Sequence, residues 1–327
     1  VPMNANRPAA PVRLITLDPG HFHAALVQKD MYPEIDPVVH VYAPGGTELH
    51  QHLAAVGRFN TRAENPTHWD EEIYTGPDFV ERMLADRQGN VVVLAGNNAR
   101  KTDYILRCIE AGYHVLADKP MVIAPEAFPK LERAFAQAAK NGLLLCDIMT
   151  ERHEITTILQ RELSMMPELF GALVAGSTDQ PAITKESVHH FAKSVAGVPL
   201  KRPAWFFDVR QEGDGTADVM THLVDLVQWE AFPEQPLHPS DVEVVSARRW
   251  ATPLTWEQFA RVTGEEQFPE YLRQDVRDDV LHVFANAEIE YRLRGIHART
   301  RAVWDFEAPR GGGDTHYSLM RGTHAQL

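Results

Sequence analysis

Short apolar runs alternate with amphipathic segments in the first part of the chain. Apolar and β-branched residues predict strands at residues 12–17, 38–42, 91–95, 114–117 and 143–147. Helical spacing of apolar residues predicts helices at residues 23–31, 47–56, 78–85, 101–111 and 126–140. Strands that alternate with helices indicate a parallel sheet with right-handed crossovers. We therefore expect residues 1–150 to form a doubly wound α/β domain of the Rossmann type.

The regular alternation of strands and helices ends after a linking helix expected at residues 154–163, and longer strands with fewer helices between them follow. Strands are predicted at residues 242–250, 280–287, 288–293 and 296–304, the last three joined by tight turns, which favours antiparallel pairing. Residues 151–327 are thus expected to form an α+β domain with a mostly antiparallel open sheet, for substrate binding and oligomerisation. An open apolar sheet face favours a homodimer or homotetramer. Residues 323–327 resemble the start of another strand, which favours a natural chain that continues further.

Charge and composition argue against nucleic-acid and membrane partners. The formal net charge is -13 and there is no basic stripe, which argues against a nucleic-acid or anionic-membrane partner. No stretch approaches the roughly 18 apolar residues of a membrane span. The first residues are polar without an apolar signal core, although a signal peptide already removed would leave the same start. Localisation therefore stays open between the cytoplasm and export.

The chain has two cysteines, and each lies in an apolar predicted element. Cys108 falls in a predicted helix and Cys146 in a predicted strand. Buried free thiols are the expected state, rather than a disulfide.

A lysine follows the predicted strand at residues 114–117, in the tripeptide Asp118-Lys119-Pro120. Open α/β sheets build their sites at the carboxyl ends of the strands. Because a proline biases the preceding residue away from helical backbone, Lys119 should be held extended at the strand tip. A lysine in that position can direct its ammonium group at a substrate oxygen.

The first turn, Asp18-Pro19-Gly20-His21-Phe22-His23, lies where a dinucleotide fold keeps its glycine-rich phosphate loop. Only Gly20 remains of the usual three glycines. Amides at the start of a helix can still hold a pyrophosphate, because that anion site comes from the helix terminus. Gly20, His21, Phe22 and His23 are therefore candidate cofactor contacts.

His21 and His23 also allow a rival interpretation. Two histidines at this spacing after a first strand resemble the metal-binding pair of amidohydrolase barrels, since two imidazoles on an extended segment can share a divalent metal. That architecture needs eight repeated units, whereas this chain changes to antiparallel strands past its middle. A capping and a packing role for the two rings is favoured instead, and no metal site is predicted.

Two further segments bear on the cofactor. Gly96, Asn97 and Asn98 follow the strand at residues 91–95, where a ligand crosses the strand ends, although asparagines there are also common turn formers. The tip of the second strand lacks the usual acidic ribose clamp, since Glu48 comes late, and it has no arginine for a 2′-phosphate. The choice between NAD and NADP stays open, with a lean toward NAD.

The strongest candidate partner of Lys119 lies on a predicted helix that follows Gly213 and Gly215. Asp218, His222 and Asp225 are spaced to share one face of that helix. A histidine can relay a proton near neutral pH, and a carboxylate one turn away can fix its tautomer. The remaining candidate substrate contacts have no defined role: Glu151, Arg152, His153, His189, His190, Lys193, Arg202, Trp205 and Asp225.

These motifs, in this order, resemble the Gfo/Idh/MocA oxidoreductases, the family of glucose-fructose oxidoreductase and inositol dehydrogenase. The family segment usually ends in Glu-Lys-Pro, so Asp118 is a conservative replacement, and the Lys119-Pro120 bond is expected to be able to adopt the cis form. The family helix usually carries Asp, His and Asp at the spacing of Asp218, His222 and Asp225. The first turn and the run that follows Asp147 look like the branch often labelled "putative oxidoreductase".

The resemblance implies a nicotinamide cofactor across the first domain, in contact with Asp118, Lys119 and Pro120 as well as the first turn and Gly96-Asn97-Asn98. It implies that Lys119 polarises the reacting hydroxyl or carbonyl of a sugar, polyol or glycoside. His222 would take or return the proton, while Asp218 orients His222 or holds the substrate. An alternative within the resemblance is a cofactor-retaining glycosidase or lyase that works by transient oxidation, elimination and re-reduction. A sensing protein without catalysis is disfavoured by the presence of all three residues.

Overall fold

The computed structural model describes residues 12–195 and 198–327. The chain forms two compact units, Val1–Ile148 and Met149–Leu327, which are described separately. Among the described residues, no helix combines the length and the apolar character needed to cross a bilayer.

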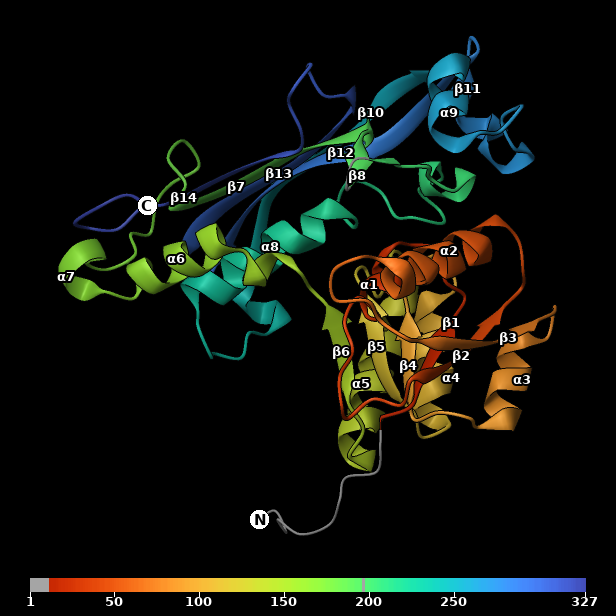
Figure 1. Ribbon diagram of the computed structural model, residues 1–327. Coiled ribbons are helices and arrows are strands. Elements are labelled where there is room, and N and C mark those ends of the chain that lie inside the picture. The colour runs from red at the N-terminus through yellow and green to blue at the C-terminus, as the bar shows by residue number, and fades with distance from the viewer. Residues whose placement is uncertain (1–11, 196–197) are drawn as a thin grey trace, which may run out of the picture. The chain divides into compact units, whose positions relative to one another are not determined.

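The first unit is built on a six-stranded parallel sheet with the order β3-β2-β1-β4-β5-β6 (Figure 1). Its strands are β1 Leu14–Leu17, β2 Val38–Ala43, β3 Asp70–Thr75, β4 Val91–Leu94, β5 His114–Asp118 and β6 Leu145–Ile148. The strand order reverses between β1 and β4, which is the topological switch point of a doubly wound sheet. The predicted fold of this unit is confirmed.

Helices cover both faces of this sheet, which explains why its central strands are apolar on both sides. They are α1 His23–Leu26, α2 Thr47–Thr61, α3 Phe79–Asp86, α4 Lys101–Glu110 and α5 Phe128–Asn141. Ile15 and Leu17 of β1 pack in a core with α3, α4 and α5, while Leu14 packs in a second core with α2. Burial on both faces is the physical origin of the uninterrupted apolar runs.

Three details of the first unit differ from the sequence-based expectation. Helix α1 ends at Leu26 instead of continuing to residue 31, and the carbonyl of Gln28 accepts a hydrogen bond from the Trp69 indole at 2.6 Å. Strand β3 was not expected, because Asp70–Thr75 is a largely exposed edge strand with three acidic residues. Cys108 is buried as expected, whereas Cys146 is exposed because β6 is the opposite edge strand; both thiols are free.

The second unit has a six-stranded mixed sheet with the main order β10-β12-β13-β7-β14, and β11 pairs with β12. The strands are β7 Ile183–Ala192, β10 Val242–Thr255, β11 Val276–Arg277, β12 Val280–Leu293, β13 Ile296–Glu307 and β14 Thr315–Met320. Only the β13–β7 pair is parallel among the described pairs of this sheet. The predicted mostly antiparallel sheet is therefore confirmed, although residues 280–293 form one strand rather than two, and β7 and β14 were not predicted.

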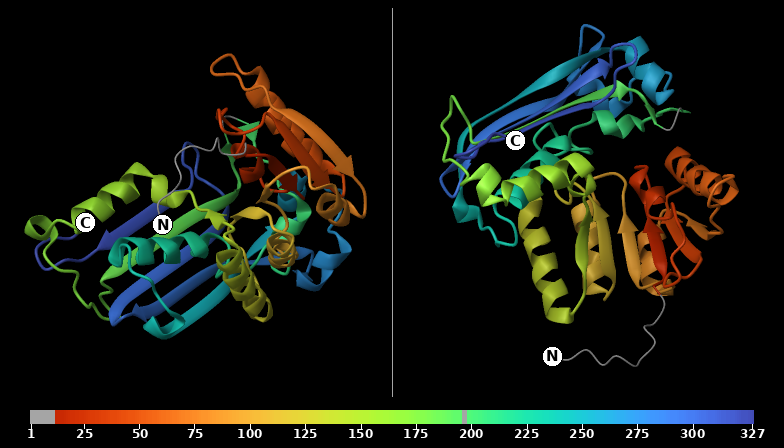
Figure 2. Two further views of the ribbon diagram at one scale, coloured as in Figure 1. Left: turned by 90° about the horizontal axis from the view of Figure 1, so that it is seen from below. Right: turned by 60° about the vertical axis from the view of Figure 1, so that its left-hand side comes forward.

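Helices α6 and α8 lie along one face of this sheet, as Figures 1 and 2 show. The helices of the unit are α6 Ile155–Ser164, α7 Pro167–Phe170, α8 Val219–Ala231 and α9 Trp256–Thr263. Helix α8 packs on β7 and β13 and contributes Met220, Leu223 and Val227 to the two cores of the unit. The short elements are β8 Ser194–Val195, β9 Val198–Pro199, η1 Pro125–Ala127, η2 Glu151–His153, η3 Ala204–Phe207, η4 Pro239–Asp241 and η5 Glu270–Asp275.

Candidate active site

The turn after β1 is hydrogen-bonded to the residue that follows β4 in the first unit. The amides of Gly20 and His21 donate to the Ala95 carbonyl at 3.0 and 2.9 Å. A Cβ atom at Gly96 would lie 2.1 Å from the Asp18 carbonyl oxygen, so only glycine allows this close approach. Two amides expected to face a phosphate are thus committed to Ala95. Helix α1 itself has only four residues.

Two histidine side chains of the same turn hold the carboxylate of Asp118 at the end of β5. His21 Nδ1 lies 2.7 Å from Asp118 Oδ2, and His23 Nδ1 lies 3.0 Å from Oδ1. Burial alone would raise the pKa of Asp118, but His21 and His23 outweigh it and hold that pKa well below its usual value. Burial lowers the pKa of His21 to about 4, so a neutral imidazole donates its Nδ1 proton to an ionised Asp118.

His21, His23 and Asp118 also form a group whose potential metal-ligand atoms lie within 4.8 Å of one another. The open six-stranded sheet excludes the amidohydrolase barrel that the histidine pair resembles. The Nδ1 atom of each ring is at hydrogen-bond distance from its own oxygen of the Asp118 carboxylate, so the two rings and the carboxylate satisfy one another through these atoms. That no metal binds here stays a prediction.

Lys119 follows this cluster directly, and the Lys119-Pro120 peptide bond is cis. The main chain next to Lys119 is fixed from α4: Lys101 Nζ donates to the Asp118 carbonyl at 3.1 Å, and the Thr102 hydroxyl donates to the Met121 carbonyl at 2.6 Å. Lys101 is buried although it is a lysine at the start of a helix. Sequence reasoning missed its role, because a helical lysine is ordinarily a surface residue.

A hollow at the carboxyl ends of β1 and β4 lies at the switch point, where a dinucleotide is expected to bind. It is lined by Leu17, Asp18, Leu94, Ala95, Gly96, Asn97, Lys101 and Tyr104. Burial raises the pKa of Asp18 to about 6, and the negative charge of Glu48 adds to the rise. Glu48 itself stands on the first turn of α2 and does not line the hollow. The position of this hollow, at the point where the strand order reverses, is the one at which a doubly wound sheet binds a dinucleotide.

Asp218 and His222 are both buried in the second unit. Asp218 occupies the N-cap position of α8, and His222 follows one turn later on the same face. Burial lowers the pKa of Arg202 to about 10, and the negative charge of Asp218 partly offsets that effect. The residues expected to act together thus share one helix face inside the second unit.

Arg202 is held as a structural residue. Its guanidinium lies over the Phe206 and Trp304 rings, 4.4 and 4.9 Å from their centroids. It donates to the carbonyls of Phe191 at 3.0 Å and His190 at 3.2 Å. Trp205, another candidate substrate contact, is half-buried against the same core.

The candidate cluster of His189, His190 and Lys193 converges on Asp314 in the loop between β13 and β14. His189 Nδ1 and His190 Nδ1 lie 3.2 and 3.1 Å from the Asp314 carboxylate, and Lys193 Nζ donates to it. Burial would raise the pKa of Asp314, but the hydrogen bonds of His189 and Lys193 lower it far below its usual value. Sequence reasoning missed Asp314, because it lies more than a hundred residues away in a glycine-rich loop.

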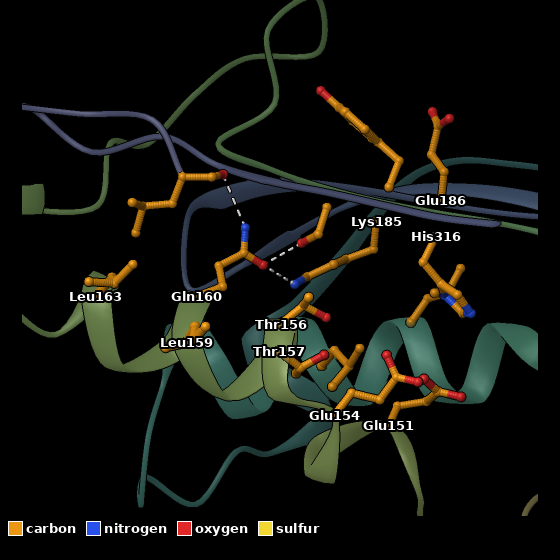
Figure 3. Close-up of a pocket in the computed structure, with 15 residues that line it drawn as sticks. Glu151, Glu154, Thr156, Thr157, Leu159, Gln160, Leu163, Lys185, Glu186 and His316 are labelled. Carbon is orange, nitrogen blue, oxygen red and sulfur yellow. Dashed lines mark hydrogen bonds between the residues drawn. The ribbon is translucent and has the colours of Figure 1, made fainter.

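Asp225 and Arg152 form an ion pair between α8 and η2, with Arg152 Nε 2.6 Å from Asp225 Oδ2. Glu151 lines a cavity of about 450 Å³ against β7 and β14 (Figure 3), whereas His153 is exposed. The three neighbouring candidates therefore have three different surroundings.

Comparison with known proteins places the chain in a family. Residues 23–146 match the family model described as "Oxidoreductase family, NAD-binding Rossmann fold", and residues 159–327 match "Putative oxidoreductase C terminal domain". A solved "putative oxidoreductase" from Parabacteroides merdae is 52% identical with a TM-score of 0.95, and the match covers 97% of this chain and 73% of that one. No curated protein matches the chain.

More distant structures share the fold. GenD2 from gentamicin A biosynthesis, solved with NAD, is 17% identical with a TM-score of 0.61, covering 98% of this chain and 72% of that one. The WlbA dehydrogenase from Bordetella pertussis, solved with NADH and UDP-GlcNAcA, is 14% identical with a TM-score of 0.58, covering 95% of this chain and 77% of that one. The chain belongs to the Gfo/Idh/MocA family of oxidoreductases, and its first unit is the NAD-binding Rossmann domain of that family.

Proposed function

We propose that this NAD-binding oxidoreductase moves a hydride between the nicotinamide and a hydroxyl or carbonyl of a sugar, polyol or glycoside. The observation that carries the proposal is the environment of Lys119. It follows a buried carboxylate held by two imidazoles, at the end of a strand beside the switch-point crevice. Among the structures of similar fold, WlbA was solved with a nucleotide sugar, and GenD2 belongs to the biosynthesis of gentamicin A.

The proposed roles follow from the charge and proton changes of the reaction. The bound nicotinamide supplies the acceptor or donor for the hydride. Lys119 donates a hydrogen bond to the reacting oxygen and stabilises the negative charge that grows on it. His222 takes the hydroxyl proton during oxidation and returns it during reduction. Asp218, one turn before His222, stabilises the imidazolium that forms.

The test is a panel of sugars, polyols and glycosides mixed with purified protein and added NAD. The proposal predicts NADH in proportion to a product that has lost two hydrogen atoms, as read by absorbance and mass spectrometry. A product that has lost a leaving group without net NADH would instead support transient oxidation by a retained cofactor. Absence of both products across the panel would contradict the proposed substrate class.

A further inference from the structure

One face of α8 carries four residues at successive four-residue steps: Asp218, His222, Leu226 and Glu230. Residues at this spacing line up along a helix. The helix packs on β7, and Glu230 Oε2 lies 2.5 Å from Lys185 Nζ of that strand. At the other end of the helix, burial lowers the pKa of His189, and the negative charge of Asp218 partly offsets that effect. Asp218 thus lies near His189, and Glu230 near Lys185.

These two anchors fix the direction of α8 relative to β7. The Asp218 end of α8 lies at the His189 end of β7, and the Glu230 end lies at the Lys185 end. The helix and the strand therefore run in opposite directions. Alternate residues of a strand share a face, so Ser187 is the residue between them on the side of α8. His222 lies between Asp218 and Glu230 and therefore faces the part of β7 that contains Ser187. A buried row of polar side chains runs between a helix and a sheet, where apolar residues are the rule.

Several polar atoms in this row have no hydrogen-bond partner among the described residues. They are Ser187 Oγ, Thr300 Oγ1, Glu230 Oε1 and His189 Nε2. Thr300 of β13 is paired in register with Lys185, so it belongs to the same face. Ser187 and Thr300 are 1% and 0% exposed, and bulk solvent does not reach them. Buried polar groups of native proteins are satisfied by protein or by ordered water.

The row ends at the cavity of about 450 Å³. Lys185 lines this cavity and donates to Gln160 Oε1 at 2.9 Å, as Figure 3 shows. Gln160 also accepts from the Ser318 hydroxyl and donates to the Leu327 carbonyl. Polar groups therefore continue from the helix–sheet layer to the cavity wall.

We propose that Ser187, Thr300, Lys185 and Glu230, with ordered water between them, form a proton path from His222 to this cavity. We call this group the polar seam. The inference rests on the proposed function, in which oxidation sends a hydride to the nicotinamide and the hydroxyl proton to His222. His222 is 6% exposed, so the proton needs an internal route to solvent.

The transfer conserves atoms and charge along the seam. Imidazolium His222 gives its proton to a water, and the Ser187 hydroxyl accepts one proton while it donates another. The Glu230 carboxylate accepts the proton and passes it to Lys185, which lines the cavity and gives one of its own protons to water there. The cycle leaves every seam residue unchanged, and reduction of a carbonyl runs the same path in reverse.

The first test is a high-resolution crystal structure of the protein, whose result does not depend on activity. The proposal predicts ordered water bonded to Ser187 Oγ and Thr300 Oγ1, continuous toward the Lys185–Glu230 pair. A dry seam, with both hydroxyls turned to backbone carbonyls of their own strands, would overturn it.

The second test separates proton release from hydride transfer by rapid mixing with a pH-indicator dye. Ser187→Ala, and the double variant Lys185→Met/Glu230→Gln that leaves no unpaired buried charge, should slow proton release about tenfold relative to NADH formation. Thr184→Val is the matched control, because Thr184 is a buried residue of β7 on the opposite face. Release at the control rate in both seam variants would overturn the path. If the unmodified protein transfers no hydride, the proposed function fails and the crystallographic result alone decides the seam.

Discussion

His21 Nδ1 lies 2.7 Å from Asp118 Oδ2, which joins the turn after β1 to the end of β5 across 97 residues of sequence. His23 holds the other carboxylate oxygen, and Lys101 holds the main-chain carbonyl of the same aspartate. The residue before Lys119 is thus fixed at three points. Catalytic side chains act best when their supporting residues are locked in this way.

Loss of this support should appear in both stability and activity. His23→Ala removes a hydrogen bond to a buried charged group, and we expect it to lower the free energy of unfolding by about 2 kcal/mol. Turnover should fall while NAD affinity changes less. Urea denaturation and calorimetry measure the two effects.

The control for His23→Ala is His40→Ala. His40 pairs with Glu72, whose side chain is 63% exposed, so its loss should change stability by less than about 1 kcal/mol. Equal losses in the two variants would show that the Asp118 contacts have no special role.

Asp18 predicts a pH dependence of cofactor binding. Its pKa is about 6 in the folded protein against 3.8 for an ordinary aspartate, so the carboxyl loses its proton as pH rises through about 6. Because a carboxylate repels a pyrophosphate, NAD affinity should fall over that interval. The same ionisation lowers the stability of the fold as pH rises from about 4 to about 6, since the unfolded chain ionises first.

Asp18→Asn is the variant that isolates this effect. It should bind NAD with an affinity that no longer changes through about pH 6, as measured by calorimetry on both sides of that value. An unchanged pH profile in the variant would assign the dependence to another group.

The Arg152–Asp225 pair is predicted to act through structure. Arg152 is 37% exposed and Asp225 is 16% exposed, so Asp225→Asn should cost about 1 kcal/mol of stability. The Michaelis constant for the substrate should then change less than about twofold, because the pair is already satisfied within the protein. A large rise of that constant with normal stability would instead make Asp225 a substrate contact.

Association of the protein is predicted from β10, an edge strand with exposed valines. Val242 and Val244 are 40% and 61% exposed and lie on the same face of the strand. We expect a homodimer or homotetramer by light scattering, and dissociation in Val244→Glu. A monomer at all protein concentrations would contradict this prediction.

The strands that could be predicted from sequence are those whose environment matches their composition. Central strands such as β4 are apolar because helices cover both faces. Strand β7 escaped prediction because Lys185, Ser187 and His189 place polar groups on its inner face. A strand that carries the proposed polar seam breaks the alternation that identifies ordinary strands, as functional segments often do.

The site was predictable only where its residues are close in sequence. Asp218 and His222 belong to one helix, and their spacing of four residues predicts that they share a face of it. The contact of His21 with Asp118, and that of Lys193 with Asp314, join segments about a hundred residues apart. Spacing carries no information about such pairs, because the tertiary fold alone decides which strand ends and loops meet.

Transfer of deuterium tests the central claim most directly. A polyol or sugar that supports NADH formation is prepared with deuterium on the reacting carbon, and the reduced cofactor is analysed by mass spectrometry. The account predicts deuterium on the nicotinamide with the unmodified protein. It predicts a loss of transfer of about 100-fold or more in Lys119→Ala and in His222→Ala, with NAD affinity retained. Transfer at the unmodified rate in both variants would contradict the assignment of these residues.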